Sequence, residues 1–255
     1  MSKRQPLIAG NWKMHKTQAE ARALAREIRQ GLPPGARAEV LVAPPFTALN
    51  AVAGELSGSS IRLGAQDTFW ERQGAYTGAI SPVMLADAGC HYVIVGHSER
   101  RQLFGDTNQD VNRKLLAVLE AGPAPILCIG ETLAERQAEE TLHVVAAQLH
   151  EGLAGLPGEA RERVVIAYEP VWAIGTGQTA TPKQAQEVQA FIRKIVGEIF
   201  SSPMAQGVRI LYGGSVKPEN IGELMAMNDV DGALVGGASL EVKSFAKIIR
   251  GCISR

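Results

Sequence analysis

Lysine, histidine and glutamate side chains that could take part in proton transfer stand at the ends of short apolar runs in this chain. Lys13 closely follows one such run, His97 follows a second, and Glu169 ends a third. Together they offer a cation, a group that can polarise a carbonyl, and a carboxylate base. Each type alone is more often structural: a solvated lysine, a core histidine or an ion-paired glutamate. Their shared position after apolar runs favours chemistry.

His97 lies where a helix is expected to begin. The positive end of that helix disfavours imidazolium and predicts a neutral ring near pH 7. A neutral ring can donate a hydrogen bond to a carbonyl oxygen and can also exchange protons. Glu99, two residues on, has two interpretations. It is either a carboxylate in the first helical turn or the partner of a site cation such as Lys13.

Glu169 is followed by an unusual loop. Residues 170–177 are apolar in the middle and carry proline and glycine towards the ends. This composition is unusual for an exposed loop and favours a lid that hides its apolar tip when it closes over a ligand. The Glu169 carboxylate, among apolar neighbours, is a candidate general base once water is excluded.

Glycine pairs follow two further apolar runs. Gly213 and Gly214 precede Ser215, and Gly236 stands next to Gly237. Glycine lets backbone N–H groups approach an anion closely, so two pairs predict a phosphate site. The chain has no G-x-x-x-x-G-K-[ST] loop, and Ser215 lacks the glycine of a hydrolase nucleophile elbow. Nucleotide binding and nucleophilic hydrolysis are therefore disfavoured.

Eight apolar runs must position these groups. They read as nearly continuous apolar segments, as strands buried on both faces of a parallel sheet do. They cover residues 7–12, 39–43, 61–66, 92–96, 125–130, 164–169, 209–213 and 232–236. Strand–helix units of this number and length predict one (β/α)8 TIM barrel domain over residues 1–255, with an open doubly wound sheet as the alternative. In a barrel, the candidate groups all meet at the C-terminal ends of the strands.

Helix signals separate the strands. Capping-box or N-terminal proline patterns occur at Thr17 with Glu20, Thr132 with Glu135, and Thr181-Pro182 with Gln184. Apolar residues also recur at helical spacing. These are Leu142, Val145, Leu149 and Leu153 in one segment and Ala185, Val188, Ile192, Ile195 and Ile199 in the next.

The composition narrows the class of partner. Lys plus Arg and Asp plus Glu are equal at 26 each, so neither nucleic acid nor an anionic membrane is expected to bind. Cys90, Cys128 and Cys252 form no ligand cluster, which predicts free buried thiols and no metal. The start of the chain does not resemble a secretory signal, and no apolar run reaches the ~20 residues of a membrane span. We expect a cytoplasmic enzyme.

The set of groups points to proton transfer beside a carbonyl in a small phosphorylated substrate. Four segments then resemble the signatures of the triosephosphate isomerase family, in that family's order. They are residues 11–14 (NWKM), 96–100 (GHSER), 167–177 (AYEPVWAIGTG) and 212–216 (YGGSV). The resemblance covers essentially the whole chain, and the segment around Glu169 is its most specific part.

The resemblance implies roles for the catalytic residues, without a cofactor. Glu169 removes a proton from the carbon beside the carbonyl of dihydroxyacetone phosphate and returns it to the neighbouring carbon, giving glyceraldehyde 3-phosphate. Neutral His97 polarises the carbonyl and moves protons between the enediolate oxygens. Lys13 stabilises the negative charge, Asn11 is its hydrogen-bonding neighbour, and Glu99 orients the group.

The resemblance also implies a phosphate site. The backbone N–H groups of Gly175, Ser215, Gly236 and Gly237 bind the phosphate, and its binding helps to close the lid. Closure suppresses loss of phosphate from the enediolate.

The loop from Gln66 to Ile80 is similar to the family's dimer loop, which implies a homodimer in which Thr77 of one copy reaches Asn11 and Lys13 of the other. An ordinary surface loop is the alternative, but it exposes aromatic residues at a cost. These are Phe69, Trp70 and Tyr76. Departures from the usual family pattern, at Ala79, Asp106 and His15, concern the interface and leave the catalytic set intact.

Two other functions remain open from the residues. Another phosphate-binding barrel enzyme, such as a different sugar-phosphate isomerase or an aldolase, has the same glycine pairs. A Schiff-base aldolase needs a lysine in mid-barrel, and none of the eight runs contains one. A barrel that only binds a ligand has no use for Glu169, His97 and Lys13 together.

Overall fold

The computed structural model describes residues 4–32, 37–175 and 178–252. Thr176 and Gly177, the last two residues of the expected lid, and the first three residues of the chain lie outside these ranges.

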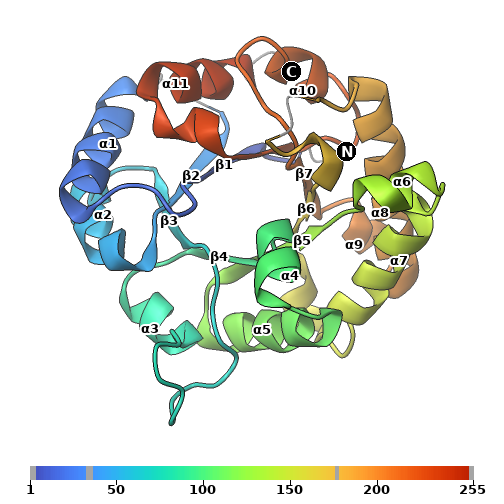
Figure 1. The fold of residues 1–255 in the computed structure, drawn as a ribbon, viewed down its shortest axis with the longest axis horizontal. Coiled ribbons are helices and arrows are strands. Elements are labelled where there is room, and N and C mark those ends of the chain that lie inside the picture. Colours follow the sequence, from blue (N-terminus) through green and yellow to red (C-terminus); the bar gives the residue numbers. More distant parts are fainter. Residues whose placement is uncertain (1–3, 33–36, 176–177, 253–255) are drawn as a thin grey trace.

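Eight parallel strands form a closed barrel in which each strand pairs with the next and β8 pairs with β1. The barrel expected from the sequence is confirmed, and the open sheet is wrong (Figure 1). Each strand end lies within one residue of its expected place. The strands are β1 (Leu7–Asn11), β2 (Glu39–Ala43), β3 (Arg62–Ala65), β4 (Tyr92–Val95), β5 (Ala124–Ile129), β6 (Val165–Tyr168), β7 (Arg209–Tyr212) and β8 (Gly232–Val235).

Helices surround the barrel as an outer ring (Figure 1). They are α1 (Gln18–Gly31), α2 (Leu49–Leu56), α3 (Pro82–Asp87), α4 (Ser98–Phe104), α5 (Asn108–Ala121), α6 (Leu133–Gln137), α7 (Thr141–Gly152), α8 (Pro182–Ile199), α9 (Ser202–Ala205), α10 (Ile221–Met225) and α11 (Val242–Gly251). The expected capping boxes begin α1, α6 and α8, so local sequence fixes where these helices start.

The apolar face expected from the sequence is buried on α8 and only partly buried on α7. On α8, the expected apolar face packs against the barrel, with Val188 and Ile192 buried. On α7, Val145 and Leu149 are buried, but Leu142 is 41% exposed. The expectation for Leu142 was wrong because Thr141 takes the buried position in the first turn of this helix.

Strand alternation decides which residues face the barrel axis. One apolar cluster fills the interior and includes Leu7, Ala9, Val165 and Ala167. Residues between them in sequence, such as Ile8, belong to the larger cluster between the strands and the helices. Because side chains alternate along a strand, the next inward positions after these pairs are Asn11 and Glu169. The interior layer thus continues directly into the candidate site.

A polar cluster closes the opposite, N-terminal end of the barrel. Arg209 Nη1 donates to Glu39 Oε2 at 2.6 Å, and Tyr92 Oη donates to the same oxygen at 2.8 Å. Burial raises the pKa of Glu39, but these donors lower it by more, so its pKa lies below the ordinary value. Because the folded pKa is depressed, this stabilisation is present above the unfolded pKa and is lost as pH falls through the folded pKa.

Glu39→Gln should therefore lower the free energy of unfolding at pH 7 by about 2 kcal/mol, since it removes a charged acceptor from three donors, those two and Arg62. The difference from the wild type should shrink at acidic pH, once Glu39 itself becomes protonated. Denaturant unfolding at both pH values measures it. Glu55→Gln, which removes a carboxylate bound to the exposed Arg26, is the control and should change little. An equal loss at both pH values would contradict the charge argument.

Cys90, Cys128 and Cys252 are free and buried, as expected. No helix in the described part of the chain is long and apolar enough to cross a membrane. Among the described residues, no three His, Cys, Asp or Glu side chains are grouped closely enough to hold a metal ion.

Candidate active site

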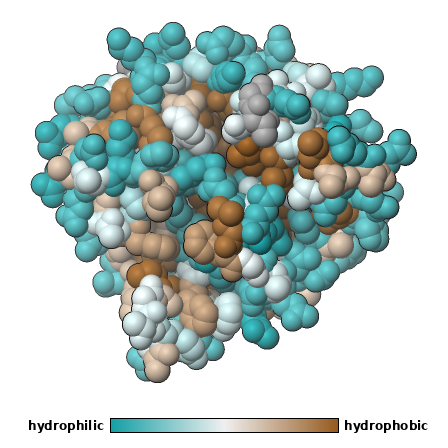
Figure 2. All heavy atoms as spheres, in the orientation of Figure 1, coloured by the Kyte–Doolittle hydropathy of each residue, from teal (hydrophilic) through white to brown (hydrophobic). Residues whose placement is uncertain are grey.

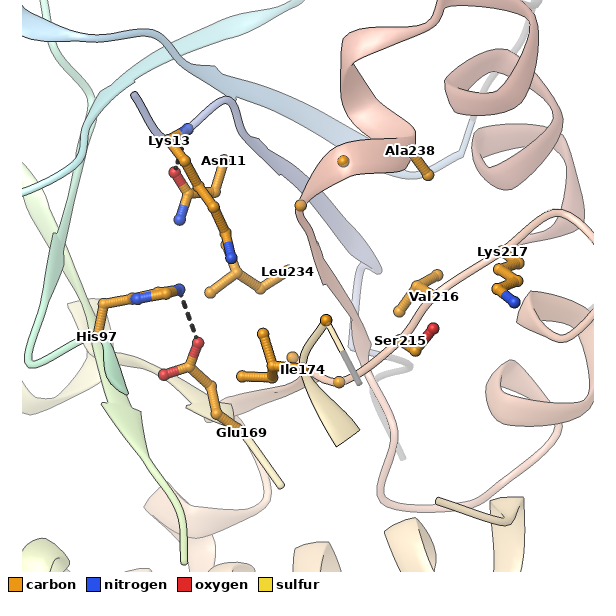
Figure 3. Close-up of a pocket in the computed structure, with 15 residues that line it drawn as sticks. Asn11, Lys13, His97, Glu169, Ile174, Ser215, Val216, Lys217, Leu234 and Ala238 are labelled. Atoms are coloured by element: carbon orange, nitrogen blue, oxygen red, sulfur yellow. Dashed lines mark hydrogen bonds and ion pairs between the residues drawn. The ribbon is translucent and has the colours of Figure 1, made fainter. Parts of the chain in front are cut away.

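A cavity of about 300 Å³ opens at the C-terminal ends of the strands. Eight of the residues expected at the site line it: Asn11, Lys13, His97, Glu169, Gly175, Ser215, Gly236 and Gly237. Lys13, His97 and Glu169 lie on one side, and Ser215, Val216 and Ala238 lie on the other (Figure 3). The ninth expected residue, Glu99, reaches the site through Lys13.

Lys13 is held in an uncommon backbone conformation. Its φ of 52° is left-handed, which costs free energy for any residue with a Cβ. Asn11 Oδ1 accepts the Lys13 N–H at 3.0 Å, and Gln66 Nε2 donates to the Lys13 carbonyl at 2.8 Å. The lysine ammonium lies 2.6 Å from Glu99 Oε1, which supports the second interpretation of Glu99. The strained turn aims the ammonium into the cavity (Figure 3).

Glu169 is buried, and two groups meet its carboxylate. Oε2 accepts the backbone N–H of Ser98 at 2.9 Å, and Oε1 lies 2.9 Å from His97 Nε2. Burial raises the pKa of Glu169, but His97, the Ser98 N–H and Lys13 lower it by more, so the net direction is downward. The carboxylate is therefore ionised near neutral pH, as a base must be. A Cβ at Gly213 would come within 2.8 Å of Glu169 Cγ, so glycine leaves this side chain its room.

The His97 ring has its tautomer set by the helix that follows. His97 caps α4, and its Nδ1 accepts the backbone N–H of Glu99 at 3.2 Å. Nδ1 therefore carries no proton, and a neutral ring carries its proton on Nε2, facing Glu169. Burial lowers the pKa of His97, but the Glu169 carboxylate raises it by more, so the net direction is upward. The helix end alone predicts a lowered pKa, and the Glu169 carboxylate in contact with the ring reverses that direction.

The glycine-lined side of the cavity is braced from behind. Asn220 Oδ1 accepts the Lys217 N–H at 2.9 Å, and Asn220 Nδ2 donates to the Ser215 carbonyl at 2.9 Å. Ser239 Oγ donates to the Gly236 carbonyl at 2.7 Å. Both turns are thus fixed without filling the cavity.

The expected lid begins as a 3-10 turn over Val171–Ala173. The Trp172 indole N–H donates to Glu131 Oε1 at 2.9 Å, and Tyr168 Oη lies 3.1 Å from each oxygen of this fully buried carboxylate. Ile174 and Gly175 line the cavity. Glu131 therefore holds the first turn of the segment expected to form the lid.

Sequence reasoning missed Ser98 and Glu131 as parts of this site. The Ser98 N–H belongs to the first turn of α4, where backbone N–H groups lack helical partners, so the position offered a signal. Glu131 follows β5 by two residues, and the strand-end rule could have selected it. Its contact with the lid had no sequence signal.

The loop from Gln66 to Ile80 projects beyond the ring of helices, between β3 and α3 (Figure 1). Its neck closes where the Phe69 N–H donates to the Ile80 carbonyl at 2.8 Å. The Phe69 ring packs at a tilt against those of Trp70 and Tyr76, and only Tyr76 of these three is exposed, at 45%. The projection carries pale and tan residues where most of the rim is teal (Figure 2).

The three departures from the family pattern lie in different surroundings. Ala79 is exposed on the projecting loop, and His15 is exposed after β1. Asp106 is half-buried and its Oδ2 lies 2.5 Å from Lys114 Nζ and 3.2 Å from Arg100 Nε. Asp106 therefore has charged partners within its own chain.

A closed parallel barrel with a buried carboxylate, a histidine and a lysine around one cavity, opposite glycine turns, defines an enzyme class. It is the class of barrel isomerases that transfer protons on small phosphorylated substrates. The family model described as triosephosphate isomerase matches residues 6–252, and the chain belongs to this family.

Curated relatives named triosephosphate isomerase align over nearly their whole length. That of Moorella thermoacetica is 62% identical over 247 residues, which are 96% of this chain and 98% of the relative. That of Syntrophotalea carbinolica is 55% identical, over 97% of this chain and 98% of the relative. That of Carboxydothermus hydrogenoformans is 54% identical, over 98% of this chain and 100% of the relative.

Proposed function

We propose that this cavity is where the chain interconverts dihydroxyacetone phosphate and D-glyceraldehyde 3-phosphate, the reaction of its family in glycolysis and gluconeogenesis. The observation that carries the assignment is the meeting of His97 Nε2 and Glu169 Oε1 at 2.9 Å, beside Lys13, in one cavity. A base, a proton donor and a cation are thus within reach of one small molecule.

The proton transfer follows from these positions. The substrate carbonyl takes the place of the Glu169 carboxylate at His97 Nε2, and Glu169 turns from Ser98 towards the adjacent C–H. Glu169 removes that proton, an enediolate forms, and His97 moves a proton between its two oxygens. Glu169 then returns its proton to the neighbouring carbon. Lys13 stabilises the negative charge on the enediolate, and Glu99 and Asn11 hold Lys13.

The opposite side of the cavity takes the phosphate. Gly175, Ser215, Gly236 and Gly237 line the cavity there. Backbone N–H groups next to small side chains suit a compact anion. The lid that begins after Glu169 closes over the phosphate and excludes water, which protects the enediolate from loss of phosphate. We also place the enzyme in the cytoplasm, because free buried thiols are typical of a reducing compartment.

A coupled assay tests the function directly. The purified chain, given D-glyceraldehyde 3-phosphate, should produce dihydroxyacetone phosphate, and a phosphoglycolate-type analogue of the enediolate should inhibit it competitively. The unphosphorylated glyceraldehyde should be a far poorer substrate. Turnover of neither triose phosphate would refute the assignment.

The projecting loop supports a homodimer. Tyr76 and Thr77 are exposed on it, and exposed apolar residues elsewhere include Met14, Met84 and Phe104. Exposed apolar residues are stabilised when a second copy covers them. In the proposed dimer, Thr77 of one copy reaches Asn11 and Lys13 of the other, so each active site is completed by its partner.

Sedimentation at micromolar concentration should therefore give a dimer. Thr77→Lys should shift it towards monomer and lower activity, because it places a charge at the expected contact. Ser57→Lys also introduces a lysine, at the exposed residue directly after α2, and should alter neither property. A fully active monomer would contradict the role of Thr77.

A further inference from the structure

Arg101 is an arginine beside the catalytic residues that the mechanism above does not use. It lies on α4, half-buried, four residues after His97. Within residues 4–32, 37–175 and 178–252, no carboxylate lies within ion-pair distance of its guanidinium. A charged group taken out of water without an opposite charge is costly, so such groups are uncommon.

The guanidinium instead binds three oxygens from three segments. Nε donates to the Gly96 carbonyl at 2.8 Å, Nη1 to Asn108 Oδ1 at 2.6 Å, and Nη2 to the Cys128 carbonyl at 3.2 Å. Gly96 directly precedes His97, and Cys128 lies on β5. The planar fork therefore ties the end of β4 to β5 and to the start of α5, a task that needs several donors in fixed directions.

Groups on both sides of this connection lie against the Glu169 carboxylate. The carboxylate binds His97 Nε2 and the Ser98 N–H, which follow Gly96 directly. On the other side, burial and then the Glu169 carboxylate beside it raise the pKa of the Cys128 thiol. Arg101 and Glu169 also line a common second cavity of about 310 Å³ behind the active site.

We propose that Arg101 is a positioning residue for the reaction, which fixes the Gly96–Ser98 turn against β5 and places an unpaired positive charge behind the Glu169 carboxylate. The proposal rests on the proposed function, because it takes Glu169 to be the base. The charge favours the ionised carboxylate when Glu169 leaves the His97 ring to meet the substrate, which is when its other partners are lost.

The charged groups around Glu169 show why Arg101, and not Lys13, is assigned this role. Glu169 faces His97, Lys13, Cys128 and Arg101. Of the two permanent cations, Lys13 is paired with Glu99 at 2.6 Å. Arg101 itself faces Cys128, Glu169, Asp106 and Glu151, while Asp106 is bound to Lys114 and Arg100. Burial lowers the pKa of Arg101, but a guanidinium remains charged at every pH of interest.

Arg101→Gln and Arg101→Lys separate the two parts of the role. Both variants lose the three hydrogen bonds of the guanidinium, so the Gly96–Ser98 turn should shift slightly. Small displacements of reacting groups lower rates strongly, and kcat should fall about 10-fold or more in each variant. Only Arg101→Gln loses the charge, so only its acidic limb in the pH profile of kcat should move up, by about one unit. Steady-state assays with glyceraldehyde 3-phosphate from pH 4.5 to 8 measure both effects, and the phosphate ionisation of the substrate is common to all forms.

Arg163→Gln is the matched control for Arg101→Gln. Arg163 also donates to backbone carbonyls, those of Leu119, Gly122 and Pro123, but it lies away from the cavity and should keep the wild-type profile. Wild-type kcat in Arg101→Lys would overturn the positioning role. An acidic limb at the same pH in the wild type and both variants would overturn the role of the charge. Should Arg101→Gln not fold, wild-type kcat or a shifted limb in Arg101→Lys still decides against the proposal. An inactive wild type would instead refute the proposed function.

Discussion

Glu169→Asp should lower kcat by about 100-fold or more and leave the barrel folded. The change withdraws the carboxylate by one methylene, and a base displaced by about 1 Å from its proton loses rate on this scale. The backbone of residue 169 is held by its own N–H, which donates to the Ile129 carbonyl at 2.7 Å, so the shorter side chain cannot recover the position. KM should change much less, since phosphate contacts are untouched.

Steady-state kinetics in both directions measure this effect, with thermal unfolding as the check on folding. Glu223→Asp makes the same substitution at an exposed position of α10 and should keep wild-type kinetics. Wild-type turnover in Glu169→Asp would remove Glu169 as the base.

Lys13→Gln should lower kcat/KM by about 1,000-fold, because it removes the ammonium that stabilises the enediolate in a cavity sheltered from water. The loss also frees Glu99, whose Oε2 lies 3.6 Å from His97 Nδ1. An unpaired carboxylate there favours the protonated ring, which is the wrong state for a neutral proton donor. Both effects lower kcat, so the variant should be impaired even at saturating substrate.

Lys217→Gln is the comparison for Lys13→Gln. Lys217 also lines the cavity, but it lies beyond Ser215 and Val216, away from Glu169 (Figure 3). Its loss should act on KM more than on kcat, because it can only influence the phosphate end. Equal losses of kcat in the two variants would contradict a specific role for Lys13 at the reacting carbons.

The sequence predicted the barrel and most of the cavity for a simple reason. Buried parallel strands have continuous apolar runs, and in a barrel the residues after those runs must meet at one end. Asn11 and Glu169 follow inward-facing strand positions, so their place was set by alternation. His97 was predicted near Lys13 by the same rule. For Glu99 the sequence left two interpretations open, and the contact with the Lys13 ammonium supports the second.

What sequence reasoning missed depends on contacts between distant segments. The upward shift in the pKa of His97 comes from Glu169, which is 72 positions later in the chain. The buried carboxylate of Glu131 binds Trp172 across 41 positions. The exposure of Leu142 depends on which neighbour covers the first turn of α7. Spacing along one element carries no information on such contacts.

The left-handed backbone of Lys13 has a consequence for how this chain can change by mutation. Such a conformation costs an L-residue about 1 kcal/mol or more, a cost that glycine does not have. Lys13→Gly should therefore remove strain even as it abolishes the ammonium, so selection for a more robust fold and selection for turnover oppose each other at this position. Variant libraries screened only for thermal stability should lose this lysine, while libraries selected for growth that depends on the enzyme's activity should keep it.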